Sequence, residues 1–374
     1  MKTRMKIIEV SSDTNIGGAG KCLLTLLENF DYDKFEVKVI LPKNSLLKPH
    51  MEKLGIEVIE ADGIADKSLD FGAVKELKAI FKKEKPELVH THASMSARIA
   101  AKQAGVKTVY TRHSVFPPSK RISKGLGKKI NGFVNNRLAD GIIAVAEAAK
   151  ENLTDTGIDE GKITVILNGV DGLERADDSE RVKIRERFGV RDGEKVISIV
   201  ARLEDIKGHM YFIEAADMIL KTEKSVKFFI AGTGSYESAL KEKAKSLGLE
   251  ENVIFTGFID DVDKLMNITD IQVNASYGTE ATSLALLEGM SIGVPAVVSD
   301  FGGNPGVIKD GVNGLVVPKQ SSAALAKGIL KLLTDEEAYA KMSDGAVRIF
   351  NKTFTAKAMT RNTEDLYIKV IGKE

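Results

Sequence analysis

Short runs of β-branched and apolar residues alternate with longer amphipathic segments from one end of this chain to the other. This alternation is typical of βα units built on a mainly parallel sheet. It occurs as two successive series, so the chain is expected to be α/β with two doubly wound parallel sheets. The first series predicts strands at residues 6–10, 36–41, 57–60, 88–91, 108–110, 141–145 and 164–167, and the second at 195–200, 227–231, 253–256, 271–274, 296–299 and 314–317.

A polar segment separates the two series and marks the expected domain boundary. Residues 168–192 are rich in Asp and Arg and contain Gly169 and Gly172, which places the linker near residues 170–175. A chain of 374 residues also exceeds what one hydrophobic core usually serves. We therefore expect an N-terminal Rossmann-like domain at residues 1–171 and a C-terminal one at 172–354.

Charge and cysteine content exclude several classes of function. A formal net charge of +1 argues against a general affinity for nucleic acid. The single cysteine, Cys22, cannot form an internal disulfide or a cysteine-based zinc cluster, and we expect it to be a buried residue on a helix. The first apolar run is interrupted by Glu9, far short of a signal-peptide core, and no stretch approaches the roughly 20 uncharged residues that span a bilayer. We expect a cytoplasmic protein.

Two glutamates, Glu280 and Glu288, flank what reads as the N-terminus of a helix. With about 1.5 Å of rise per residue, their carboxylates would lie on the order of 12 Å apart, a spacing that suits opposite ends of an extended ligand. Between them, the backbone N–H groups of Thr282, Ser283 and Leu284 would lack intrahelical partners and lie at the positive end of the helix dipole. This arrangement favours a diphosphate and predicts a nucleotide-sugar site.

The segment that follows the first predicted strand is rich in glycine but matches no standard phosphate-binding signature. A P-loop needs Gly at Asn15 and Ser or Thr at Cys22, and a dinucleotide fingerprint needs a third glycine at Leu23. What remains is a Gly17-Gly18 loop, at which backbone N–H groups at a helix start can approach a ligand closely.

Two cations, Arg202 and Lys207, lie in the loop after the first strand of the second series. Arg offers bidentate hydrogen bonds and Lys a point charge, so the pair could neutralise a departing nucleoside diphosphate. The alternative is a solvated loop in which Arg202 pairs with Glu204 or Asp205.

Further glycine loops follow later strands of the second series. Gly232 and Gly234 form an isolated GxG that permits close approach, but Glu237 stands at the third glycine position, which makes a dehydrogenase unlikely to be the right interpretation. Residues 302–306 form another glycine-rich loop that could contact a sugar.

Three histidines lie at predicted strand ends of the first series. His113 is expected to point toward the ligand edge of the sheet, with functional and structural interpretations equally open. His90 and His92 alternate along one strand and should share a face. No cysteine or carboxylate lies beside them in the sequence, so we expect hydrogen-bonded structural histidines and no metal site.

Residues 119–137 combine a predicted apolar helical face with cations and no acid. This pattern suits an anionic membrane surface, and a packed helix with a solvated basic edge is the equally open alternative. The apolar positions are Ile122, Leu126, Ile130, Phe133 and Val134, and the cations are Lys120, Arg121, Lys124, Lys128, Lys129 and Arg137.

Taken together, these residues resemble the retaining glycosyltransferases of family 4 along nearly the whole chain. The resemblance implies the GT-B fold, in which two Rossmann-like domains face each other across a cleft, with a final helix at residues 355–374 that packs back onto the first domain. The matching motifs occur in family order and comprise the Gly17-Gly18 loop, residues 162–171, Arg202 with Lys207, the Gly232 loop, residues 253–258 and the segment with Glu280 and Glu288.

The resemblance also implies roles for individual residues. Arg202 and Lys207 would bind the donor diphosphate, together with the backbone N–H groups of Ser283 and Leu284. Glu280 would bind the transferred sugar and Glu288 the ribose. His113 would lie near the reacting sugar carbon and the Gly17-Gly18 loop near phosphate and acceptor, and the residues by the base would be Phe258 and Ile259.

Enzymes of this kind keep the anomeric configuration of the sugar, usually without a metal. The departing phosphate can itself accept the acceptor's proton. Two positions differ from the usual pattern: Ser283 stands where Gly is frequent, and Gly306 stands where Glu is common. The first should matter little, because the backbone N–H binds phosphate, whereas the second weakens any inference about the sugar.

The expected activity is transfer of a hexose or N-acetylhexosamine from a UDP-sugar, in preference to a GDP-sugar, to a glycan or lipid-linked acceptor in cell-envelope polysaccharide or glycolipid synthesis. No cofactor or metal is expected. The enzyme would be cytoplasmic, with peripheral contact to the inner face of the cell membrane left open. The alternatives are a UDP-sugar 2-epimerase of the same fold and a nucleotide-sugar-binding protein without catalysis.

Overall fold

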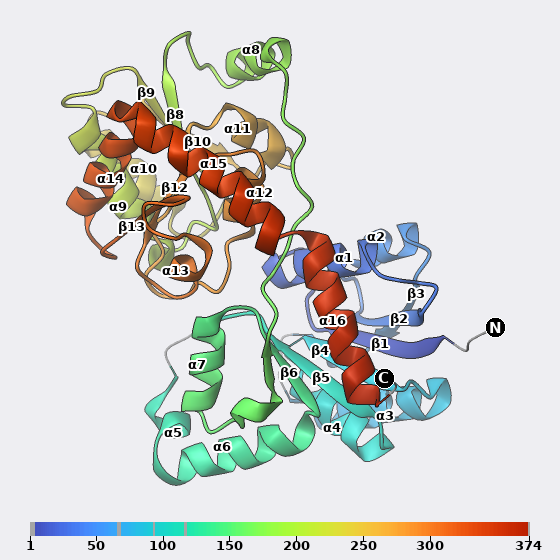
Figure 1. The fold of residues 1–374 in the computed structure, drawn as a ribbon. Coiled ribbons are helices and arrows are strands. Elements are labelled where there is room, and N and C mark those ends of the chain that lie inside the picture. The colour runs from blue at the N-terminus through green and yellow to red at the C-terminus, as the bar shows by residue number, and fades with distance from the viewer. Residues whose placement is uncertain (1–3, 66–68, 93, 116–117, 373–374) are drawn as a thin grey trace. The chain divides into compact units, whose positions relative to one another are not determined.

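The computed structural model describes residues 4–65, 69–92, 94–115 and 118–372. The chain divides into two compact units. Unit 1 comprises Met1–Gly169 together with Ala356–Glu374, and unit 2 comprises Val170–Thr355. Figure 1 shows the elements of both units in chain order.

Unit 1 is built on a parallel sheet of seven strands in the order β3-β2-β1-β4-β5-β6-β7. Its central pairing joins β1 to β4 in parallel, with Glu9 opposite His90 and Ser11 opposite His92. Strand β4 is buried throughout and β1 from Ile7 onward, as expected for a parallel sheet covered by helices on both faces. The strands are β1 (Met5–Ser11), β2 (Phe35–Pro42), β3 (Glu57–Ala61), β4 (Leu88–His92), β5 (Lys107–Arg112), β6 (Gly141–Ala144) and β7 (Ile163–Val165).

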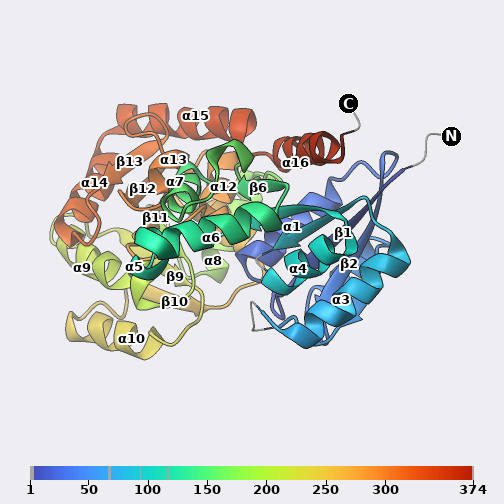
Figure 2. The ribbon, with the colours of Figure 1, turned by 90° about the horizontal axis from the view of Figure 1, so that it is seen from below.

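The helices of unit 1 connect these strands, and several begin at sequence-encoded caps. Asp70 and Ser94 accept hydrogen bonds from backbone N–H groups at the starts of α3 and α4, which lie side by side (Figure 2). Their apolar faces bury Leu77 and Phe81 in the core. The helices are α1 (Gly18–Glu28), α2 (Lys48–Lys53), α3 (Phe71–Glu84), α4 (Met95–Ala104), α5 (Lys120–Ser123), α6 (Gly125–Leu138) and α7 (Glu147–Asp155).

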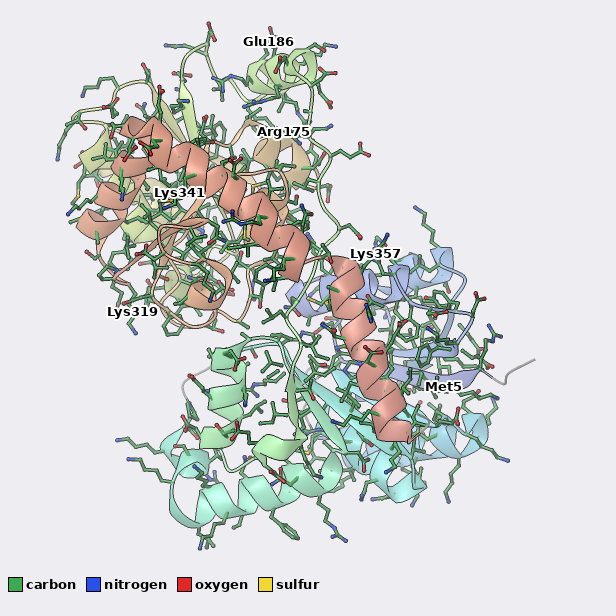
Figure 3. The ribbon with its side chains drawn as sticks, in the orientation of Figure 1. Met5, Arg175, Glu186, Lys319, Lys341 and Lys357 are labelled. Carbon is green, nitrogen blue, oxygen red and sulfur yellow. The ribbon has the colours of Figure 1, made fainter. Side chains whose placement is uncertain are left out.

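The last helix of the chain, α16 (Ala356–Ile371), also belongs to unit 1. It contacts α1 and β5, and Lys357 lies in its first turn, far along the chain from Met5 at the start of β1 (Figure 3). Its Tyr367 is fully buried and packs edge-on against Phe35. Unit 1 is therefore completed by residues from both ends of the chain.

Unit 2 repeats the design with a parallel sheet of six strands in the order β10-β9-β8-β11-β12-β13. Its core lies between this sheet and the helices α9 and α14, where Phe212, Phe228 and Ile329 are buried. The strands are β8 (Lys195–Val200), β9 (Val226–Ala231), β10 (Val253–Gly257), β11 (Ile271–Asn274), β12 (Ala296–Ser299) and β13 (Gly314–Val317).

The helices of unit 2 follow the same alternation with the strands. Ser321 and Asp335 cap α14 and α15 with their side chains. The helices are α8 (Asp178–Arg187), α9 (His209–Ile219), α10 (Glu237–Ser246), α11 (Val262–Ile268), α12 (Leu284–Ser291), α13 (Asn304–Val307), α14 (Ser322–Thr334) and α15 (Glu336–Thr353), with a short 3-10 helix, η2, at Asp205–Lys207.

All thirteen strands that the sequence predicts are present, and the expectation of two doubly wound parallel sheets is confirmed. In each sheet the strand order reverses beside the first strand, between β1 and β4 in unit 1 and between β8 and β11 in unit 2. Ligands bind beyond the carboxyl ends of strands at such switch points. Among the described residues, no helix has both the length and the apolar character that crossing a bilayer requires.

Candidate active site

In unit 2, the carboxylate of Glu280 is the centre of a buried polar cluster beyond the end of β11. Its Oε2 accepts hydrogen bonds from Lys207 Nζ at 3.0 Å, Asn274 Nδ2 at 3.0 Å and Ser276 Oγ at 2.9 Å. The Lys207 side chain is 13% exposed and that of Glu280 8%. A buried ion pair is tolerated when further hydrogen bonds satisfy the charges, and two neutral donors do so here.

The next loop along the sheet supports this cluster from behind. Asn304 donates from Nδ2 to Ser299 Oγ at 3.0 Å, and Ser299 donates to the backbone oxygen of Ser276. Gly303 N–H donates to the backbone oxygen of Glu280 at 3.0 Å. A Cβ on Gly302, which has φ +58°, would lie 2.2 Å from that same oxygen. The glycine-rich loop at 302–306 therefore holds the Glu280 backbone in place.

The two cations of the β8 loop lie in different environments. Arg202 extends from the loop with its side chain 73% exposed and pairs with Glu204 at 3.0 Å, which is the pairing anticipated as the alternative to phosphate binding. Lys207, at the end of η2, is instead held by Glu280 and donates to the backbone oxygen of Thr279 at 3.1 Å. An exposed pair such as Arg202–Glu204 contributes little stability, so Arg202 can change partner at small cost.

The helix after Glu280 begins between the two glutamates, as the sequence indicated. Ser283 is the N-cap of α12, its hydroxyl accepts from Leu286 N–H, and the first helical residue is Leu284. Glu280 thus lies in the loop before the helix. Of the two glutamates, Glu288 alone lies on the helix, and its side chain is half-buried. The expected separation of about 12 Å assumed helical rise from Glu280 to Glu288, and this assumption does not hold across residues 280–283, which precede the helix.

The two glycines of the GxG loop after β9 pack against the backbone of the β8 loop. A Cβ on Gly232, which has φ +138°, would lie 2.1 Å from the backbone oxygen of Ala201, and one on Gly234 would lie 2.3 Å from that of Leu203. These glycines let the β9 loop pack directly beneath the loop that carries Arg202. After β10, Phe258 is 71% exposed and Ile259 is partly buried.

In unit 1, the three histidines form one hydrogen-bonded group with a carboxylate. His113 Nε2 lies 2.7 Å from His92 Nδ1, and His92 Nε2 lies 3.0 Å from Glu9 Oε2. The His90 Nδ1 atom lies 2.9 Å from the same oxygen. His90 and His92 share a sheet face as expected, but the expectation that no carboxylate accompanies them was wrong, because β1 pairs with β4 and places Glu9 beside them.

Tyr367 and Thr111 complete this group, in which Glu9 is fully buried. Tyr367 donates to Glu9 Oε1 at 2.7 Å, and Thr111 Oγ1 lies 2.6 Å from His90 Nε2. Burial alone would raise the pKa of Glu9, but the attraction of His90 and the hydrogen bonds of both histidines hold it well below its usual range. Glu9 is therefore an ionised carboxylate inside the protein.

Glu9, His90 and His92 also present three atoms of the metal-binding kind within 4.8 Å of one another. Each of these atoms already takes part in a hydrogen bond within the group. The cluster is thus a buried carboxylate that is hydrogen-bonded to its donors.

A pocket with about 320 Å³ of empty space, open solvent included, lies against this group. Its wall includes His113, Asn168 and Cys22, and the thiol of Cys22 is buried as the sequence predicts, with a pKa raised by burial to about 12. Gly17 and Gly18 lie at the start of α1, where a Cβ at either position would meet no atom within 4 Å. The backbone of this loop is therefore open to a ligand.

The basic segment folds as α5 and α6, at the edge of unit 1 (Figure 1). Its apolar face is directed to solvent, with Leu126 73% exposed, Phe133 68% and Ile130 55%. The helix packs through Gly132 and Asn135 instead, and Asn135 Oδ1 accepts from buried Arg98 at 2.8 Å. Of the two alternatives left open by the sequence, the helix packed through its apolar face is therefore not the one observed.

Comparisons with known proteins agree with this geometry. The family model described as "Glycosyltransferase Family 4" matches residues 16–172, and the model "Glycosyl transferases group 1" matches residues 180–348. The chain is a family 4 glycosyltransferase. Its GT-B fold is shared with the structure of Anabaena Alr3699/HepE in complex with UDP, at a TM-score of 0.84 and 23% identity over 98% of this chain and 100% of that one.

Two curated relatives indicate the range of substrates among similar enzymes. UDP-Gal:alpha-D-GlcNAc-diphosphoundecaprenol alpha-1,3-galactosyltransferase of Escherichia coli is 26% identical over 385 residues, which cover 99% of this glycosyltransferase and 98% of the relative. Alpha-monoglucosyldiacylglycerol synthase of Streptococcus pneumoniae is 27% identical over 258 residues, which cover 64% of this chain and 57% of the relative. The first name specifies an acceptor linked to diphosphoundecaprenol, and the second specifies a glucosylated diacylglycerol as the product.

Within this glycosyltransferase, sequence reasoning missed the residues that hold the predicted ones. Asn274 and Ser276 bind Glu280, and Glu9 and Tyr367 anchor the histidines. One signal was available for Glu9, since it is a charge inside the apolar strand β1, where a buried ion needs partners.

Proposed function

We propose that this glycosyltransferase moves a hexose or N-acetylhexosamine from a nucleotide sugar, a UDP-sugar in preference to a GDP-sugar, to a glycan or lipid-linked acceptor in the synthesis of cell-envelope polysaccharide or glycolipid. The observation that carries the proposal is the similarity along 99% of the chain to an enzyme named for UDP-Gal and a diphosphoundecaprenol-linked acceptor. The structural neighbour in complex with UDP adds support for the uridine nucleotide.

The donor site that we propose uses the loops of unit 2. Arg202 and Lys207 would neutralise the diphosphate, and the backbone N–H groups of Thr282, Ser283 and Leu284 would bind it at the start of α12. The exposure of Arg202 and its weak pairing with Glu204 support this role.

The remaining donor contacts would be made with the transferred sugar, the ribose and the base of the nucleotide sugar. Glu280 would accept from hydroxyl groups of the transferred sugar, and Glu288 from the ribose. The exposed Phe258 ring and neighbouring Ile259 would pack on the base, with Gly232 shaping the loop between them and Arg202. In unit 1, His113 and the backbone of Gly17 and Gly18 would bind substrate groups.

We also propose that transfer retains the anomeric configuration and needs no metal or cofactor. Negative charge builds on the leaving diphosphate, and Arg202, Lys207 and the α12 N-terminus offer a positive environment for it. Proton NMR of the first product formed would give the anomeric configuration. Equal rates with and without EDTA are expected, and loss of activity that Mg²⁺ or Mn²⁺ restores would contradict metal independence.

The experiment that tests the activity incubates the full chain with UDP-galactose, UDP-glucose, UDP-N-acetylglucosamine or GDP-mannose and an N-acetylglucosamine-diphospholipid acceptor. Transfer from a UDP-sugar is the expected result. Isomerised UDP-sugar without acceptor would identify an epimerase instead. Donor binding with neither transfer nor hydrolysis across a broad acceptor panel would identify a non-catalytic binding protein.

For the acceptor side, we propose that α5 and α6 bind the inner face of the cell membrane. Leu126, Ile130 and Phe133 would enter the headgroup boundary, while Lys124 and Lys129 would meet anionic lipid. The support is the exposure of this apolar face beside cations without an intervening acid. The other cations of this surface are Lys120, Arg121, Lys128 and Arg137.

Flotation with vesicles that contain anionic phosphatidylglycerol tests the membrane proposal. The Leu126→Ser/Phe133→Ser variant and the Lys124→Glu/Lys129→Glu variant should both lose flotation. Val182→Ser removes another exposed apolar residue, from α8, and should float like the parent chain. Absence of parent-chain binding, with activity on soluble acceptors alone, would remove the proposal.

A further inference from the structure

One ring nitrogen of His113 is buried without a hydrogen-bond partner. Among the described residues, no donor or acceptor meets its Nδ1, although its Nε2 is bonded to His92. His113 also lines the pocket next to the histidine cluster. A buried polar atom normally has a partner, so an unpartnered one that lines a pocket is suited to a ligand group.

The carboxylate of Glu9 determines where the protons of the cluster lie. An ionised carboxylate can only accept, so the contact from His92 Nε2 requires a proton on that nitrogen. A neutral His92 then has a bare Nδ1, which accepts from His113 Nε2–H at 2.7 Å. The remaining nitrogen of His113, Nδ1, is left with a lone pair and no proton.

We propose that Glu9 and His92 are positioning residues that hold His113 as the tautomer protonated on Nε2, so that its Nδ1 accepts a hydrogen bond from a substrate hydroxyl group. This inference rests on the proposed glycosyl transfer for the identity of the substrate. A phosphate oxygen has no proton to donate at neutral pH, so the neutral ring selects a sugar hydroxyl rather than the diphosphate.

The surroundings keep the ring neutral and the relay rigid. Burial lowers the pKa of His113 well below its usual value. The two imidazoles of His92 and His113 stack at an interplanar angle of 20°. Tyr367 donates to the other oxygen of Glu9, so the carboxylate cannot rotate away from His92 without losing that bond. These contacts fix the direction of the His113 ring as well as its proton.

Nitrogen-15 NMR of the histidine rings in the full chain tests the tautomer directly. His113 should show a protonated Nε2 and a bare Nδ1 in the free protein. In Glu9→Leu, the carboxylate is gone and His113 should become a mixture of tautomers. Thr111→Val is the matched control, because it removes only the bond to His90, and it should leave the His113 spectrum unchanged.

A protonated Nδ1 on His113 in the parent chain would overturn the proposal, and so would an unchanged tautomer in Glu9→Leu. If Glu9→Leu does not fold, His92→Phe provides the second variant, since it keeps a ring in place and removes the nitrogen that His113 bonds. His113 should again become a tautomer mixture, and a single unchanged tautomer would contradict the relay.

Turnover then separates positioning from packing. His92→Phe should lower kcat about 10- to 100-fold while the dissociation constant for UDP changes less than about twofold. His92→Asn should recover part of the loss, because its amide oxygen can accept from His113 where the ring nitrogen did. Equal kcat in His92→Phe and the parent would overturn the relay, as would no recovery in a folded His92→Asn. Failure of the parent chain to transfer any sugar would refute the proposed function and leave the tautomer measurement valid.

Discussion

Glu280 is already bound on one oxygen before any ligand arrives. Lys207, Asn274 and Ser276 all donate to its Oε2, and the pair with Lys207 is buried. Removing one member of a buried ion pair leaves an uncompensated charge and typically costs about 3–5 kcal/mol. The residue proposed to bind the transferred sugar therefore also maintains the loop around it, and substitutions there should keep the size of the side chain.

The two glutamates should respond differently to neutralisation. Glu280→Gln is expected to lower turnover far more than the affinity for UDP. Glu288→Gln should weaken UDP binding about 10- to 100-fold, as expected for loss of a charge-assisted hydrogen bond. Calorimetry with UDP measures the affinity, and initial rates with a UDP-sugar measure turnover. The control is Glu336→Gln, a change at an exposed glutamate. Equal losses of UDP affinity would contradict the assignment.

His209, at the start of α9, should make stability depend on pH. Burial, and secondly the charge of Lys207, lower its pKa to about 4, and neither ring nitrogen has a partner among the described residues. Below about pH 6.5 the unfolded chain protonates this histidine while the folded chain does not. Its contribution to the free energy of unfolding should thus fall by about 3 kcal/mol at most as the pH drops from about 6.5 to 4.

His209→Leu should remove that part of the pH dependence. Urea unfolding between pH 7 and 4.5 should give a shallower decline than the parent chain shows. The control is Phe212→Leu, another buried change on the same helix, which should shift stability equally at every pH. An identical decline in His209→Leu and the parent would show that His209 is not responsible.

At the residue level, the motifs in the sequence predict roles for Arg202, Lys207, Glu280 and His113. The groups that hold them depend on long-range register. Glu9 reaches the histidines only because β1 pairs with β4, and Tyr367 comes from the far end of the chain. Single-sequence patterns report local periodicity, and they carry no information on which strands become neighbours.

Among the elements, α6 is a helix whose apolar periodicity is easily read from the sequence, but whose apolar face does not pack against the protein. The sequence gives one apolar helical stripe, and the usual rule buries such a stripe. Here the opposite side packs, because Gly132 allows the helix to approach the backbone oxygen of Gly157 and Asn131 donates to Thr156 O at 2.8 Å. The apolar stripe therefore stays exposed and is available to bind another surface.

The two sides of α6 should therefore behave oppositely on substitution. A Cβ at position 132 would lie 2.1 Å from the backbone oxygen of Gly157, so Gly132→Ala should destabilise unit 1 by about 1–3 kcal/mol. Phe133→Ser should change stability by less than about 0.5 kcal/mol while weakening vesicle binding. Thermal unfolding and flotation measure the two effects, and strong destabilisation by Phe133→Ser would show that its ring is packed.

For the whole molecule, the strand pattern predicted both sheets because each unit repeats the same βα alternation. In both units the proposed site residues lie at the carboxyl ends of strands at or near the switch point: His92 ends β4 and His113 follows β5, and Arg202 and Glu280 follow β8 and β11. The topology rule predicts a ligand site at this edge of each sheet. Helical rise was applied too early, to the residues before α12, because a cap and a loop use the same polar residues as a first helical turn.

Uridine nucleotide should stabilise the full chain against unfolding. UDP at 100 times its dissociation constant is expected to add about 2.7 kcal/mol to the free energy of unfolding. Thermal shift with UDP, GDP and ADP measures the preference, which should follow that order from strongest to weakest. Stronger stabilisation by ADP or GDP than by UDP would overturn the donor assignment.

Unit 1 contains the first strands of the chain and its last helix, and this has a consequence for synthesis on the ribosome. All of unit 2 must be translated before α16 appears, which takes on the order of ten seconds or more at 5–20 residues per second. During that delay Glu9 lacks the hydroxyl of Tyr367, and the surface under α16 is uncovered. Unit 2 is one continuous stretch, so the half of the enzyme that is made second can finish folding first.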